Sequence, residues 1–220
     1  MSYYEKIVGK VLEKAQSLVG TKEVGQNGGK VIDEIQKVFG MKNQQYCVMF
    51  TLYCWDFVLK LVAGEKYSKP FLMTASSQTL FDWAKKNNCT YTDPTLIKPG
   101  DIVIWRKFTL WQGHAGLVLD GLNVSDNSFL TYEGNTANSD YGNQRDGDGI
   151  YQRKRFAKKL DFSIDNFYIR GFIDMQKVFD GKNLESYLTA KNALMRVKDD
   201  NASLIAFIDK LEIKKVELIR

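Results

Sequence analysis

Residues 98–119 read KPGDIVIWRKFTLWQGHAGLVL, and the periodicity of the sequence changes within this stretch. The turn signal at 98–101 is followed by an apolar run at 102–105 that predicts a strand. Further strands are expected at 115–119, 129–133, 150–155 and 168–173. Because the strands follow one another at short spacing, they favour an antiparallel sheet.

Upstream of this stretch the apolar residues recur at helical spacing. The spacing predicts helices over 3–19 and 31–39, each ended by a glycine, and a third helix over 47–63. The third is apolar nearly all round and is therefore expected to be buried. Ser76 or Ser77 is a candidate N-cap for a fourth, short helix. Helices followed by strands indicate an α+β domain, with N-terminal helices packed on the sheet.

Composition excludes several classes of protein. The chain has 220 residues, of which 44% are hydrophobic and 13% aromatic, which is too apolar for a disordered chain and long enough to bury a core. No apolar run reaches the roughly 18 residues of a membrane span. The N-terminus lacks the pattern of a signal peptide, so we expect synthesis in the cytoplasm, with release by lysis or delivery by a particle.

The net charge of +5 is spread along the chain. A nucleic-acid-binding protein would show a denser basic stripe and a recognisable motif, so we expect no nucleic-acid partner. A weak attraction to an anionic polymer, such as a bacterial wall, is compatible with this charge.

The composition changes again after Gly181, so we divide the chain into a domain at 1–181 and a C-terminal helical segment at 182–220. From Tyr187 to Leu218, apolar residues recur at the a and d positions of a heptad. Two interpretations stay open. The segment forms a coiled coil, by self-association or by docking on a virion protein, or it packs back on the domain as one or two amphipathic helices.

Four residues combine into a candidate catalytic site. Cys47 opens the buried helix, where the helix dipole favours a thiolate. His114 is the only histidine and has small neighbours. Glu133 and Asn135 lie two residues apart on one face of an extended segment, and either can orient an imidazole.

The other cysteines are not expected to take part in chemistry. Cys54 lies two turns along the buried helix from Cys47 and is expected to be inert. Cys89 is interpreted as structural or incidental. Three cysteines without an export signal argue against a disulfide framework. One histidine and no CxxC pair argue against zinc. We therefore predict no metal and no cofactor.

The ordered set of motifs resembles the CHAP domain, the cysteine, histidine-dependent amidohydrolase/peptidase group of the NlpC/P60-like, papain-related superfamily. The resemblance extends over about residues 15–175. It is carried by Tyr46-Cys47, the 98–104 segment KPGDIVI, the 113–118 segment GHAGLV, the 132–136 segment YEGNT, Gly149-Ile150-Tyr151 and Arg170-Gly171-Phe172-Ile173.

The resemblance implies a papain-like α+β fold and cleavage of an amide bond in bacterial peptidoglycan. It implies Cys47 as nucleophile, His114 as general base, Glu133 as the group that orients His114, and Asn135 as support. The backbone N–H of Cys47 would contribute to the oxyanion hole. Gln44 or Gln45 could add a side-chain donor; of the two, Gln45 is the candidate. Some members bind calcium through aspartates before the nucleophile, but residues 38–46 contain no acidic residue, so no calcium is expected there.

The leading hypothesis is a phage lysin, either a free endolysin or a virion component, acting as an N-acetylmuramoyl-L-alanine amidase or as a peptidoglycan endopeptidase. The alternatives are a catalytically silent structural or adaptor protein of a phage particle that retains the fold, and a secreted antibacterial effector. The loop at 136–149 is long enough to be functional rather than a simple connection, and its shape would contribute to bond specificity.

Overall fold

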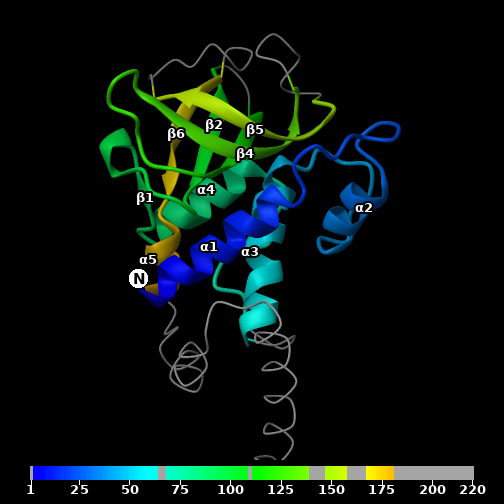
Figure 1. Cartoon of the computed structure of the whole chain (residues 1–220), viewed down its shortest axis with the longest axis horizontal. Coiled ribbons are helices and arrows are strands. Elements are labelled where there is room, and N and C mark those ends of the chain that lie inside the picture. The colour runs from blue at the N-terminus through cyan, green and yellow to red at the C-terminus, as the bar shows by residue number, and fades with distance from the viewer. Residues whose placement is uncertain (1, 64–67, 109–110, 139–146, 158–166, 181–220) are drawn as a thin grey trace, which may run out of the picture.

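The computed structural model describes residues 2–63, 68–108, 111–138, 147–157 and 167–180, which form an α+β fold (Figure 1). The helices are α1 (Tyr3–Gln16), α2 (Lys30–Lys37), α3 (Cys47–Ala63), α4 (Ser77–Lys86), the 3₁₀-helix η1 (Pro94–Leu96) and α5 (Met175–Asp180). The strands are β1 (Thr90–Tyr91), β2 (Ile102–Lys107), β3 (Gly113–Val118), β4 (Ser128–Thr136), β5 (Gly149–Phe156) and β6 (Phe167–Ile173).

The long elements match the sequence-based expectations closely. The four predicted helices and five predicted strands are present, with Ser76 as the N-cap of α4. The structure adds β1, η1 and α5, which are too short to produce a periodic signal. The segment 182–220 and residues 139–146 of the long loop lie outside the described residues.

The six strands form one antiparallel sheet in the order β1-β6-β2-β3-β4-β5. The predicted antiparallel sheet is thus confirmed. The last strand, β6, lies between the short edge strand β1 and β2. The ladder between β3 and β4 is short and pairs Leu117 with Tyr132 and Val118 with Thr131.

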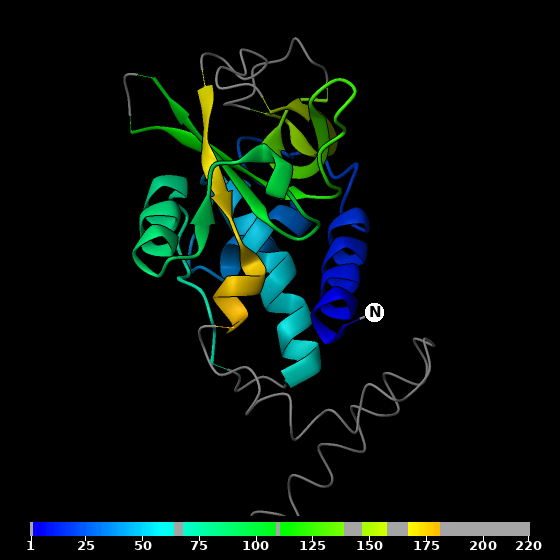
Figure 2. The same ribbon diagram turned by 90° about the vertical axis from the view of Figure 1, so that its left-hand side faces the viewer.

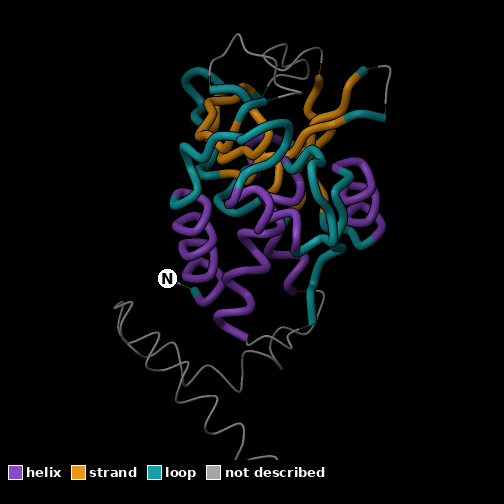
Figure 3. Tube along the Cα trace, turned by 90° about the vertical axis from the view of Figure 1, so that its right-hand side faces the viewer, coloured by secondary structure: helices purple, strands orange, loops and turns teal. Residues whose placement is uncertain are grey.

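Helices cover one face of the sheet, as Figures 2 and 3 show. Helix α3 packs against α1 on one side and against β3 and β4 on the other. Its side chains are buried nearly all round, as predicted, and they join the inner residues of α1 and the sheet in the main apolar core. Strand alternation directs Ile102 and Ile104 of β2 into this core.

The opposite face of the sheet holds a second apolar cluster. Val103 and Trp105 of β2 point into it, together with Val118, Phe129 and Phe172 from neighbouring strands. Strand β2 is therefore buried on both sides over its first four residues. The polar side chains on this second face occupy an environment that is largely closed to water.

Asp101 connects three parts of the domain. Its buried carboxylate accepts hydrogen bonds from the hydroxyl of Tyr91 in β1 at 2.5 Å and from the backbone N–H of Met175 in α5 at 3.1 Å. Burial raises the pKa of Asp101 to about 7, and the two hydrogen bonds and nearby Lys98 only partly oppose this rise. The folded state therefore holds a proton that the unfolded chain releases at lower pH.

We predict that Asp101 makes stability depend on pH. Its pKa is raised on folding from 3.8 to about 7, so its contribution is complete below about pH 4 and is lost as the pH rises through 7. The difference in unfolding free energy between wild type and Asp101→Asn should therefore shift in favour of the variant between about pH 4 and pH 8, by on the order of 1 kcal/mol or more. Urea unfolding of both proteins at the two pH values measures it. A difference that is independent of pH would contradict the prediction.

Candidate active site

Cys47 is the first residue of α3 and lies where this helix meets β4. The contact is close because β4 carries Gly134: a Cβ at that position would lie 2.8 Å from Cβ of Phe50 and 3.0 Å from Cδ2 of Tyr46. The first turn of α3 can therefore press directly on the strand. Cys47 is 7% exposed and opens onto a cavity at this end of the sheet.

His114 lies near the start of β3 and is 4% exposed. Its Nε2 is 2.8 Å from Oε2 of Glu133, and a second hydrogen bond joins the imidazole to the side chain of Cys47. Since Nε2 is engaged by Glu133, Nδ1 is the nitrogen left for the sulfur. Burial by itself lowers the pKa of His114, but the negative charges of Cys47 and Glu133 and the hydrogen bonds to both outweigh it and raise the pKa to about 9. The imidazolium form is thus favoured at neutral pH.

Two glycines of β3 make room for this arrangement. A Cβ at Gly116 would lie 3.1 Å from Cγ of Glu133, so the absence of a side chain there lets the carboxylate reach across β3 to the imidazole. A Cβ at Gly113 would lie 2.1 Å from Nε2 of Gln78, which donates a hydrogen bond to the carbonyl of Trp105 at 2.9 Å. Gly113 and Gly116 therefore make room for the side chains of Gln78 and Glu133.

Glu133 is fully buried and has several hydrogen-bond donors. Arg155 binds it in a bidentate manner, with Nε to Oε1 at 2.7 Å and Nη2 to Oε2 at 2.5 Å, and the hydroxyl of Thr131 donates to Oε1 at 2.6 Å. Burial favours the neutral acid, but Arg155 and then His114 overcome this effect and hold the pKa of Glu133 far below its usual range. Glu133 is therefore an ionised acceptor that fixes His114 from behind.

Arg155 is the functional residue that the sequence analysis missed. In the sequence it belongs to a short run of basic residues, which normally indicates a solvated surface. In β5 the run alternates: Arg153 and Arg155 are buried, whereas Lys154 between them is exposed. The period-2 pattern of the strand was the available signal, because it directs Arg155 to the same side as residue 153 and away from Lys154.

Asn135 reaches the site through a β-bulge. The register between β4 and β5 shifts between Gly134 and Thr136, and Asn135 has a φ of 54°. The sequence placed it by alternation along an extended segment, but the left-handed backbone at the bulge is what aims its side chain, a common device beside active sites. Asn135 is buried and lines the cavity together with Cys47 and His114.

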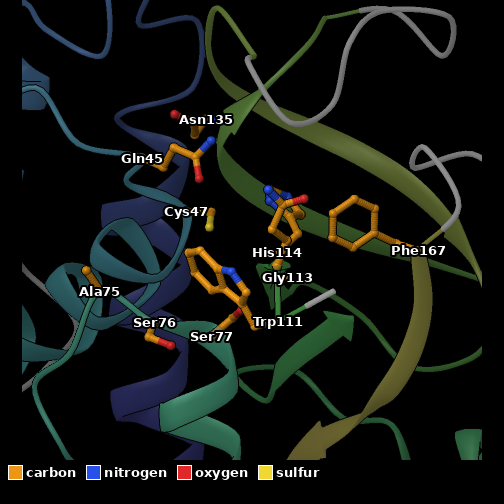
Figure 4. A pocket seen from close by; sticks show the side chains of 11 residues that line it. Gln45, Cys47, Ala75, Ser76, Ser77, Trp111, Gly113, His114, Asn135 and Phe167 are labelled. Carbon is orange, nitrogen blue, oxygen red and sulfur yellow. The ribbon is translucent and has the colours of Figure 1, made fainter. Parts of the chain in front are cut away.

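The cavity measures about 120 Å³ and brings the predicted residues together, as Figure 4 shows. Cys47, His114, Asn135 and Gln45 all line it, and Glu133 lies beneath His114. The rest of its wall consists of Ala75, Ser76, Ser77, Trp111, Gln112, Gly113 and Phe167. In Figure 4 the Gln45 amide lies on the same side of the cavity as Asn135, within the region around Cys47.

The remaining cysteines lie apart from this cavity. All three cysteines are free, and Cys54 is fully buried in α3, where burial raises the pKa of its thiol strongly. Cys89 lies three residues after the last residue of α4, and its thiol donates to the carbonyl of Asn87 at 3.2 Å. Within the described ranges, no group of three or more histidine, cysteine or acidic side chains is arranged to hold a metal ion.

Neither a protein-family model nor a curated protein matches this chain. The chemistry of the site is therefore inferred from the arrangement of its side chains and from the sequence motifs. Among the helices that the structure describes, none combines the length and apolar character needed to cross a membrane.

We predict that Arg155→Met destabilises the protein by about 3–5 kcal/mol, because it leaves the Glu133 carboxylate buried without its cation. The pKa of Glu133 should rise at the same time, since Arg155 is the main group that lowers it. Urea unfolding measures the loss, and Arg155→Lys should retain part of the stability.

The control is Lys154→Met, one residue away in the same strand. Lys154 forms an ion pair with Asp126 at 2.7 Å on the surface, and exposed pairs contribute little to stability. Its removal should leave unfolding nearly unchanged. If the two variants lost equal free energy of unfolding, the buried Arg155–Glu133 contact would contribute no more to stability than the exposed Lys154–Asp126 pair.

Proposed function

We propose that this protein is a CHAP-type cysteine hydrolase with a papain-like arrangement, and that it cleaves an amide bond of bacterial peptidoglycan. The observation that carries the proposal is the position of the single histidine. His114 lies between the buried carboxylate of Glu133 and the thiol of Cys47, and Cys47 and His114 line one cavity. A cysteine that opens a helix and pairs with a raised-pKa imidazole is the arrangement expected of a nucleophile.

The first half of the reaction is acyl transfer. The Cys47 sulfur attacks the amide carbonyl, and a C–S bond forms as the carbonyl oxygen becomes an oxyanion. The backbone N–H of Cys47, at the N-terminus of α3, and the amide of Gln45 are the candidate donors to that oxygen. Nδ1 of the His114 imidazolium then gives its proton to the leaving amine, the C–N bond breaks, and a thioester remains on Cys47.

The second half is hydrolysis. Neutral His114 takes a proton from water at Nδ1, and the hydroxide attacks the thioester. The carboxylic acid leaves and the Cys47–His114 pair is restored. Throughout both steps Glu133 holds the Nε2–H of the ring, so it acts as a positioning residue and does not exchange protons with the substrate.

We propose peptidoglycan as the substrate because the ordered motifs of this chain resemble those of the CHAP domain. These motifs lie at Cys47, residues 98–104, His114 and residues 132–136. The positive net charge agrees with attraction to an anionic wall. A phage lysin, free or carried in a virion, remains the biological setting that we propose.

Digestion of purified peptidoglycan, followed by mass analysis of the released fragments, tests the function. We expect fragments from wild type and from Cys89→Ala, whose thiol is also buried but lies outside the cavity, and none from Cys47→Ala. Circular dichroism of the three proteins provides the folding control. Fragment release by Cys47→Ala would refute the cysteine mechanism.

A second outcome would favour a silent structural protein instead. In that outcome, folded wild-type protein releases no peptidoglycan fragments from any type of wall. In addition, the thiol of Cys47 is alkylated no faster than that of Cys89.

The pH profile of hydrolysis should have its alkaline limb near pH 9. The His114 imidazolium supplies the proton for the leaving amine, its pKa is raised to about 9, and the cation is therefore lost as the pH rises through that value. Values of kcat/KM for a soluble muropeptide, measured from about pH 6 to pH 10, show this limb. An alkaline limb near 6.5, the ordinary pKa of a histidine, would show that Cys47 and Glu133 do not stabilise the cation.

A further inference from the structure

Trp111 is unusual among the tryptophans of this chain because it is 76% exposed, whereas Trp55 and Trp105 are fully buried. It is nevertheless part of the cavity that holds Cys47 and His114. Figure 4 shows its indole ring facing this cavity close to Cys47. A large apolar ring left open to water beside a nucleophile indicates a binding surface, because burial elsewhere would have stabilised the fold.

The rest of the cavity wall combines the apolar side chains of Ala75 and Phe167 with several neutral polar side chains. In Figure 4 the amides of Gln45 and Asn135 lie on the other side of Cys47 from the indole, and the hydroxyls of Ser76 and Ser77 lie near the indole. Apart from Cys47 and His114, none of the described residues that line the cavity carries a charge. Among the described lining residues, His114 is thus the one cation that could face the carboxylates of a stem peptide, whereas several amides and hydroxyls could bond an uncharged polar ring.

A pyranose ring suits this combination. Its axial C–H bonds form an apolar face that can lie on the electron-rich face of an indole, while its hydroxyl and acetamido groups point outward to hydrogen-bonding partners. The cavity of about 120 Å³ is too small to enclose a sugar with its peptide, since pockets that bury drug-sized ligands measure about 300–1,000 Å³. The scissile amide would enter the cavity and the sugar would remain on the open indole.

We propose that Trp111 is the stacking platform for the N-acetylmuramoyl ring, and that the bond cleaved joins its lactyl carbonyl to the first residue of the stem peptide. This inference rests on the proposed hydrolase function. In that bond the sugar lies directly beside the scissile carbonyl, which matches the shared cavity of Trp111 and Cys47. Cys47 bonds to the lactyl carbon, the stem peptide leaves as an amine with the proton from His114, and water releases the lactyl carboxylate.

Binding to catalytically inactive protein tests the platform without relying on turnover. Cys47→Ala in the full chain is titrated calorimetrically with a disaccharide peptide and with the same stem peptide lacking sugar. Adding Trp111→Ala should weaken binding of the disaccharide peptide about tenfold or more, and Trp111→Phe should restore most of it. Binding of the free stem peptide should not change. An equal loss for both ligands would assign Trp111 to the peptide and overturn the proposal.

Phe108→Ala is the matched control. Phe108 is another exposed aromatic residue between β2 and β3, at 54%, but it packs on Tyr168 at 5.2 Å between ring centroids and lies outside the cavity. Its removal should leave binding of the disaccharide peptide unchanged. If Phe108→Ala weakens binding as much as Trp111→Ala does, the cavity has no specific platform and the proposal fails.

The fragment ends separate this proposal from the proposed function. New amino termini on the first stem residue, with free lactyl carboxylates on the glycan, support both. New ends within the peptide, seen only with an intact Cys47, keep the hydrolase function and overturn the role of Trp111. No release of fragments and no binding of the disaccharide peptide overturn both.

Discussion

The candidate site depends on one buried interaction, the bidentate contact between Arg155 and Glu133. A carboxyl group this deeply buried would take up a proton without a cation beside it, and it would then be a poor acceptor for the ring N–H of His114. Arg155 keeps it ionised, and the hydroxyl of Thr131 satisfies a further lone pair. The orientation and charge of the imidazole follow from this contact.

The backbone is shaped around the same interaction. Gly116 leaves the space through which Glu133 reaches His114, and Gly134 lets α3 approach β4 closely enough to bring Cys47 to the imidazole. The bulge at Asn135 then turns the end of β4 toward the cavity. The two glycines have no side chain and the bulge interrupts the strand register, at points where another element must come close. Both features reduce the local stability of a strand.

Much of this could be predicted from sequence because the long elements are strongly periodic. The helix at 47–63 and the strands that follow have clear apolar patterns. Cys47 is the first residue of that helix and His114 the second residue of β3. Arg155 was missed because a charge on an inward-facing strand position contradicts the usual rule for burial, and only its partner explains it. The sequence also could not show that Asn135 lies in a β-bulge. Nor could it show that Glu133 and Gln78 occupy the space beside the glycines of β3. Both features depend on contacts between segments that are distant in the sequence.

Negative and positive groups alternate along the site, and this alternation reduces the cost of burying them. In the proposed mechanism the resting chain runs from thiolate at Cys47 to imidazolium, carboxylate and guanidinium, so its net charge is zero. Acylation removes the negative charge from sulfur, and the proton passed to the amine removes the positive charge from His114, while Glu133 and Arg155 still cancel. The buried set is neutral before and after each step, which limits the desolvation cost that an isolated charge would incur in this interior. Without Arg155, the buried Glu133 would either leave the resting site with a net negative charge or take up a proton and hold the ring N–H of His114 more weakly. In the proposed mechanism the guanidinium therefore supports catalysis although it lies three contacts from the sulfur.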